Sequence, residues 1–189
     1  MIRAVSRDTL IRRVQRFLAD TRGVSAVEFA LVLPLMLTLL IGGSEVGDGV
    51  ATKLKMSRAA YTVADLTSQF VSIQSSDMSN ILGAGSVLIA PYASTHLTVT
   101  VSEVKTTAPG GIAAIKWSAS TGTARAAGQV MTLPPAFSTL PVNTTLILGE
   151  ASYAYTPTLG YSVTGTFTFS DSYYMYPRLS DCVTYNNVC

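Results

Sequence analysis

The sequence predicts an α+β fold: a long N-terminal transmembrane helix that continues into an exported domain, with a short second helix and an antiparallel sheet of about four strands. Three observations support this prediction. An apolar run near the N-terminus is followed by helical periodicity and then by segments of strand alternation. The alternating segments are separated by turn sequences rather than by helices, and strands joined in this way pair antiparallel.

Residues 24–43 form a nearly unbroken apolar run that contains one carboxylate, Glu28, and one proline, Pro34. At a rise of 1.5 Å per residue, a helix of about 20 residues spans about 30 Å, the thickness of the hydrocarbon core of a bilayer. We therefore expect a transmembrane helix over 24–43. Glu28 would then need a partner that neutralises its charge. The alternative is that its carboxylate snorkels to the lipid head groups.

Charge is distributed unevenly about the apolar run. Residues 1–23 carry six arginines and two aspartates, a net charge of +4, whereas the whole chain carries +2. Because basic residues beside a first membrane segment stay cytoplasmic, we expect 1–23 to be a basic cytoplasmic leader and the chain after Gly43 to be extracytoplasmic. A cleaved signal peptide fits poorly, because the apolar run is longer than the core of a signal peptide and no small-x-small cleavage signal in a polar context follows it directly. Gly42-Gly43-Ser44 is the nearest candidate for such a signal. Next to a membrane segment, we expect no nucleic-acid partner.

Residues 44–91 are predicted to be an amphipathic helical region. Apolar residues recur at three- and four-residue steps to about Phe70–Ile73, and Ser75-Ser76-Asp77 provides an N-cap for a second helix over Met78–Ala90. Glycines cluster where the long helix leaves the membrane, which predicts a bend or local melting there, or alternatively a helix-packing notch. These glycines are Gly42, Gly43, Gly47 and Gly49.

Residues 92–189 are predicted to be an extracytoplasmic β-rich domain. Leu97, Val99 and Val101 should share one face of its first strand, and residues 119–143 should form a long surface loop. The expected strands are His96–Lys105, Ile112–Ser118, Thr144–Thr156 and Ser162–Asp171. Five tyrosines are expected to cap a sheet edge, with a contact surface as the alternative: Tyr153, Tyr155, Tyr173, Tyr174 and Tyr176.

The two cysteines, Cys182 and Cys189, lie close to the end of the chain. In an oxidising compartment we expect them to form a disulfide that closes a small loop, and two free thiols are the alternative. With the lone His96 they do not make a standard metal-ligand set, so no metal is expected. The sequence also lacks phosphate-loop, nucleophile-turn and paired-histidine motifs. We therefore expect that the protein is not an enzyme and binds no cofactor.

One N-terminal motif resembles a known family. Arg22-Gly23 followed by Val24-Ser25-Ala26-Val27-Glu28-Phe29 looks like the cleavage site of a type IV prepilin-like protein, and the stretch through Pro34 resembles the TadE-like proteins of the Tad (Flp) pilus assembly system. Two shorter stretches, Ala59–Leu66 and Tyr176–Ser180, support the resemblance.

The resemblance implies processing and assembly. Such proteins are cut after the glycine by a prepilin peptidase, here between Gly23 and Val24, and act as minor pilins or pseudopilins of an adhesive pilus. Glu28 and Phe29 would then be assembly residues, with Glu28 neutralising the new α-amine of a neighbouring subunit. The implied partners are the peptidase, other pilins and pseudopilins, and the bacterial inner membrane. The C-terminal domain would be periplasmic or incorporated in the pilus. The alternative is an uncleaved single-pass TadG-like envelope scaffold or binding protein.

Overall fold

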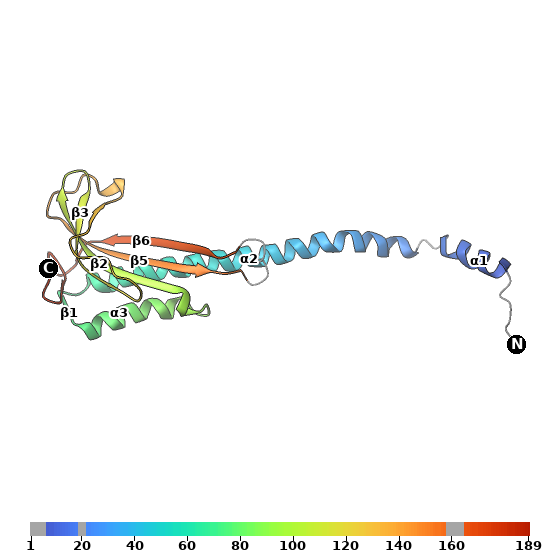
Figure 1. Cartoon of the computed structure of the whole chain (residues 1–189), viewed down its shortest axis with the longest axis horizontal. Coiled ribbons are helices and arrows are strands. Elements are labelled where there is room, and N and C mark those ends of the chain that lie inside the picture. The colour runs from blue at the N-terminus through green and yellow to red at the C-terminus, as the bar shows by residue number, and fades with distance from the viewer. Residues whose placement is uncertain (1–6, 19–21, 158–164) are drawn as a thin grey trace. The chain divides into compact units, whose positions relative to one another are not determined.

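The computed structural model describes residues 7–18, 22–157 and 165–189 (Figure 1). The chain divides into two compact units, Met1–Ser44 and Glu45–Cys189, and each is described by itself. The helices are α1 (Arg7–Leu18), α2 (Arg22–Ser68) and α3 (Ser75–Leu88), with short 3-10 turns η1 (Ser94–His96) and η2 (Pro135–Phe137). The strands are β1 (Ser72–Ile73), β2 (Leu97–Ala108), β3 (Ile112–Ser120), β4 (Val130–Thr132), β5 (Thr145–Tyr155), β6 (Phe167–Met175) and β7 (Thr184–Tyr185).

The first unit contains α1 and the apolar beginning of α2. Helix α2 is unbroken over 47 residues and includes Pro34. It stays helical at all four glycines from Gly42 to Gly49, so the predicted local melting is wrong. Each glycine weakens a helix by about 1 kcal/mol relative to alanine, but tertiary packing outweighs propensity, and Gly49 is buried against the ring of Tyr155 on β5.

In the second unit, a five-stranded antiparallel sheet has the order β4-β3-β2-β5-β6. The predicted α+β class is confirmed, but the sheet has one strand more than expected. The additional strand is β4, which pairs with β3 from Ile112↔Thr132 to Ala114↔Val130. It lies inside residues 119–143, which were predicted to be a surface loop. The buried Leu133 explains the difference, because it holds this segment against the sheet.

Two hydrophobic clusters lie on opposite faces of the sheet. The larger joins α2 and α3 to the sheet, and the predicted face of Leu97, Val99 and Val101 belongs to it. The smaller cluster lies on the other face and covers only part of it. Its buried members are Val104, Ala113, Ile115, Leu133, Leu146 and Leu148.

A β-bulge decides which side chains of β3 face the helices. Trp117 pairs with Glu103 and Ile115 pairs with Val104, so Lys116 is an extra residue between them. Trp117 therefore joins the cluster beneath the helices, and Ile115 joins the smaller cluster on the opposite face. Simple strand alternation would place both side chains on the same face.

Several boundaries differ from the prediction by a few residues. Helix α2 ends at Ser68, and α3 begins at Ser75 with Gln74 as its N-cap. Asp77 still caps this helix, because its carboxylate accepts the backbone N–H of Gln74 at 3.1 Å. The expected start of the last strand at Ser162, and most of the turn before it, lie outside the described residues.

Candidate functional site

The predicted processing residues lie in the first turn of α2. Gly23 and Val24 are exposed, and a Cβ atom placed on Gly23 would meet nothing within 4 Å. The first N–H groups of a helix have no partner in the preceding turn, so this end opens more easily than the interior. A protease can therefore approach this peptide bond without displacing a side chain of the described chain.

Glu28 and Phe29 follow one turn later. Phe29 is 65% exposed, and Glu28 is exposed without a hydrogen bond or ion pair to any residue that the structure describes. The apolar residues after them are also exposed, Leu31 to 75% and Leu40 to 69%. An apolar surface of this size requires lipid or another protein to cover it.

In the second unit, α2 packs closely on β5 through small residues. Ala60 and Ala64 face Gly149, where a Cβ atom would overlap the carbonyl oxygen of Ala60 and lie 2.8 Å from the Cβ of Ala64. Only glycine allows the helix backbone to come this near to the strand. The sequence stretch Ala59–Leu66, which contributed to the family resemblance, thus forms the contact between α2 and the sheet.

The two shorter family-like stretches meet at the end of α2. Arg178, from the stretch Tyr176–Ser180, forms an ion pair with Asp65 from the stretch Ala59–Leu66. The backbone N–H of Arg178 also donates to the carbonyl oxygen of Ser68 at 2.9 Å. The segment before the disulfide therefore donates two hydrogen bonds to the last turn of α2, one from the side chain and one from the backbone of Arg178. Sequence spacing did not reveal this contact.

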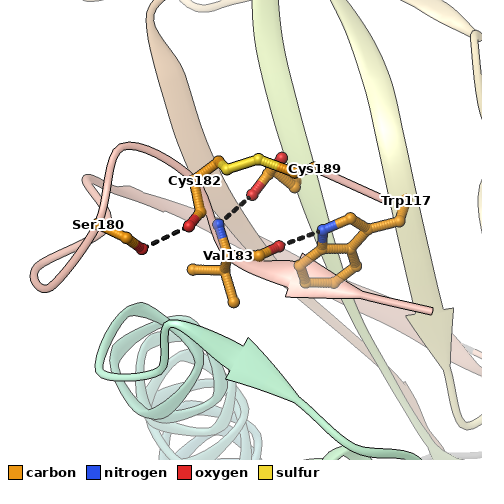
Figure 2. Close-up of a disulfide and its surroundings, with 6 residues drawn as sticks. Trp117, Ser180, Cys182, Val183 and Cys189 are labelled. Atoms are coloured by element: carbon orange, nitrogen blue, oxygen red, sulfur yellow. Dashed lines mark hydrogen bonds between the residues drawn. A yellow bond between two sulfur atoms is a disulfide. The ribbon is translucent and has the colours of Figure 1, made fainter. Parts of the chain in front are cut away.

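The predicted disulfide closes the C-terminal end of the chain (Figure 2). Cys182 and Cys189 are joined, with their Cα atoms 5.8 Å apart. Between them, Val183 is fully buried, and its carbonyl oxygen accepts the indole N–H of Trp117 at 2.7 Å. Strand β7 follows and pairs in parallel with β1 directly after α2. We call this segment, Tyr176–Cys189, the C-terminal clamp.

A buried carboxylate on β2, that of Glu103, forms a hydrogen bond with the C-terminal clamp. Glu103 is fully buried, and one of its oxygens accepts the N–H of Val183 at 2.7 Å, while the other has no partner among the described residues. Burial raises the pKa of Glu103, against the lowering effects of the Val183 hydrogen bond and of Lys116 and Lys105. The folded state thus binds the proton of Glu103 more tightly than the unfolded chain does.

The five tyrosines do not form one group, so their predicted role as a sheet-edge cap is wrong. Tyr153 and Tyr155 are buried under the helices, and the Tyr155 hydroxyl donates to the carbonyl oxygen of Glu45 at 3.2 Å. Tyr173 contacts the ring of Tyr61 on α2. Tyr174 packs on the opposite face in the smaller cluster, and Tyr176 is exposed. Strand alternation separates neighbours such as Tyr173 and Tyr174.

Among the described residues, one helix is long and apolar enough to cross a membrane, namely α2 over Gly23–Ser68. This is consistent with a single-pass membrane protein. Within the same part of the chain, no group of three or more His, Cys, Asp or Glu side chains is arranged to hold a metal ion.

Comparison with known proteins gave one family match. Residues 23–65 match the family described as TadE-like protein, whereas neither the curated proteins nor the solved structures gave a significant match. The matched range runs from the predicted cleavage glycine to Asp65, which forms the ion pair with Arg178. The resemblance seen in the sequence is confirmed over this range: the helical segment 23–65 is similar to the TadE-like family, which supports a function related to the Tad pilus.

Proposed function

We propose that the protein is a minor pilin or pseudopilin that takes part in assembly of a Tad-type adhesive pilus after cleavage between Gly23 and Val24. The observation that carries the proposal is the TadE-like match, which begins at Gly23. The chain would enter the bacterial inner membrane with residues 1–23 in the cytoplasm, because their arginines oppose translocation. Its role would be structural, with no catalytic step.

Accessibility of the cleavage site supports processing. Gly23 carries no side chain, and Val24 is 53% exposed at the open end of α2. Cleavage would remove the basic leader and leave a cationic α-amine on Val24 at neutral pH. The mature chain would then begin with an amine followed, four residues later, by the carboxylate of Glu28.

This arrangement sets a stagger between neighbouring subunits. Four residues of helix correspond to about 6 Å along the axis, so Glu28 of one subunit meets the amine of a neighbour displaced by about that length. Related charged residues at mid-membrane cost about 2.5–3.5 kcal/mol on insertion scales, and a residue near the boundary costs less. Pairing therefore favours assembly modestly, while packing of the exposed apolar helix provides the remainder.

The second unit offers a further surface for assembly. Val46, Val50 and Leu54 follow one another at four-residue steps on α2, and each is more than half exposed. Residues so spaced share one side of a helix, and the opposite side carries the buried Thr52, Met56 and Val63. This exposed side is available to the helix of another pilin.

The experiment that tests processing is the intact mass and N-terminal residue of the protein from the membrane fraction of cells that contain a prepilin peptidase. We expect a chain that begins at Val24. A chain that begins at Met1 would reject cleavage and favour the alternative, an uncleaved TadG-like envelope scaffold or binding protein. The matched control is Gly42→Ala, a glycine substitution in the same helix that should leave processing unchanged.

The assembly role of Glu28 needs a separate measurement. We expect Glu28→Gln to insert into the membrane normally but to be lost from purified pili or from the assembly complex, because the amide cannot neutralise the amine of a neighbour. The control is Ser25→Ala, which removes an exposed polar group about one helical turn before Glu28. Normal incorporation of Glu28→Gln would contradict the charge-pairing argument.

A further inference from the structure

The face of the sheet that points away from α2 and α3 contains a polar groove of about 470 Å³. Strands β2, β5 and β6 form its floor, and residues after β3 form one wall. Its lining is dominated by hydroxyl groups and includes one Arg–Glu pair. The lining residues with hydroxyl groups are Thr98, Thr100, Thr123, Ser152, Ser170 and Ser172.

The strand register arranges these side chains in two rows. Thr98, Ser152 and Ser170 lie opposite one another across β2, β5 and β6, and Thr100, Glu150 and Ser172 form the next row two residues along. Neighbouring strands are about 4.8 Å apart, and two residues along a strand span about 6.8 Å. The side chains therefore form a regular polar grid across the three strands, with hydroxyl groups at most of its positions.

Part of this grid has no partner within the protein. Thr100 is satisfied by the hydroxyl of Ser120 at 2.8 Å. By contrast, the hydroxyls of Thr98, Ser152, Ser170 and Ser172 make no hydrogen bond to any residue that the structure describes. Each of these hydroxyls can donate one hydrogen bond and accept two. They are free to bind groups of a ligand or water.

The charged groups of the groove are balanced. Arg125 donates to both carboxylate oxygens of Glu150, from Nε at 2.7 Å and from the terminal nitrogen at 2.5 Å. This bidentate pair is planar and fixed, and it keeps unused N–H donors on the arginine and lone pairs on the carboxylate. The remaining charged residue, Asp171, is engaged by Lys53 and Ser57 of α2.

We infer that this groove binds a neutral carbohydrate. A charge-balanced site attracts neither anions nor cations strongly, and a hydroxyl-rich floor matches a ligand whose groups both donate and accept. The volume lies within the range of small-molecule sites, about 300–1,000 Å³. This inference goes beyond the proposed role in pilus assembly and does not depend on cleavage or on Glu28.

The test uses the full chain in lipid nanodiscs, because detergents with sugar head groups would compete for the groove. Binding is measured by ligand-observed NMR with glucose, galactose and mannose, and on an array of neutral and anionic glycans. We expect binding to neutral glycans only. Binding of the free hexoses would show a single-residue site, and binding restricted to polymers would show that several sugar units are needed; both agree with the inference.

The variants remove hydroxyls and preserve shape. We expect Thr98→Val combined with Ser152→Ala to weaken binding about 10- to 100-fold, since each lost hydrogen bond costs up to about tenfold. Ser170→Ala combined with Ser172→Ala, at exposed positions of β6, should act similarly and avoids any change to the central strands. The control is Thr132→Val, an exposed threonine outside the groove.

Three results would overturn the inference: no binding of any neutral glycan at millimolar concentration, binding of anionic glycans alone, or binding that survives both double variants. Thermal melting of each variant confirms that the fold is kept. Failure of this experiment leaves the processing result at Gly23 unaffected, so the two proposals are tested independently.

Discussion

Replacing Gly149 by alanine perturbs the closest contact between α2 and β5. The new Cβ atom would overlap the carbonyl oxygen of Ala60 and lie 2.8 Å from the Cβ of Ala64. Neither atom can rotate away, because a carbonyl oxygen and a Cβ atom are fixed by the helix backbone. The backbone of α2 or of β5 must therefore shift locally, and overpacking of this kind costs about 1–3 kcal/mol.

This loss of stability can be converted into an expected decrease in melting temperature. For a unit the size of Glu45–Cys189, each 1 kcal/mol lowers the midpoint by about 2–4 °C, so Gly149→Ala should melt about 2–12 °C lower. The assay is thermal unfolding of the full chain in detergent, followed by fluorescence. Trp117 is the single tryptophan, is buried, and reports on the packing beneath the helices.

Two other glycines provide matched controls. At Gly83, inside α3, an added Cβ atom meets nothing within 4 Å, so Gly83→Ala should raise stability by about 0.5–1 kcal/mol through helix propensity alone. At Gly85 the Cβ atom would lie 3.1 Å from a side-chain methyl of Val99, which can adjust, so the effect should fall between the two. A Gly149→Ala chain that melts at or above the wild-type temperature would refute the close seating of α2 on β5.

Three further predictions concern the C-terminal clamp. Because the pKa of Glu103 is raised in the folded state, the stability that its proton provides is present at acid pH and is lost as the pH rises through that pKa. Glu103→Gln should therefore melt with a weaker pH dependence than the wild type at pH values above 4.5, the ordinary pKa of this group, and an unchanged slope would contradict this. Replacing both Cys182 and Cys189 by serine should cost about 2–3 kcal/mol, as expected for a loop of about eight residues, and shift Trp117 emission to longer wavelength. Asp65→Asn should cost no more than about 1 kcal/mol, because its partner Arg178 is largely exposed; a larger loss by thermal melting would show that the pair does more than a surface ion pair.

Much of the fold was predictable because its signals are local. The apolar run of α2 and the alternation of Leu97, Val99 and Val101 each lie within a few turns or one strand, and both were confirmed. Strands β1, β4 and β7 were missed because two or three residues carry no periodicity. Their positions depend on partners far along the chain, as in the pairing of Ser72 with Thr184.

The candidate site divides in the same way. Gly23, Glu28 and Phe29 could be chosen from the sequence because they form one compact motif, and their roles in processing and assembly remain predictions. The Asp65–Arg178 ion pair could not be predicted, although both family-like stretches had been recognised, because 113 residues separate its members. The prediction that the tyrosines cap a sheet edge was wrong because the sequence shows that they lie near one another in the chain but not which face of the sheet each one occupies.

The sequence by itself determined an α+β chain with one helix able to cross a membrane, a TadE-like N-terminal motif and a disulfide at the C-terminus. Only the tertiary structure decided which side chains meet. The extra residue Lys116 turns Trp117 toward Val183 and Glu103, and the absent side chain of Gly149 lets α2 approach β5. Both outcomes depend on contacts between segments distant in the chain, and a local pattern contains no information about which distant segment will be the partner.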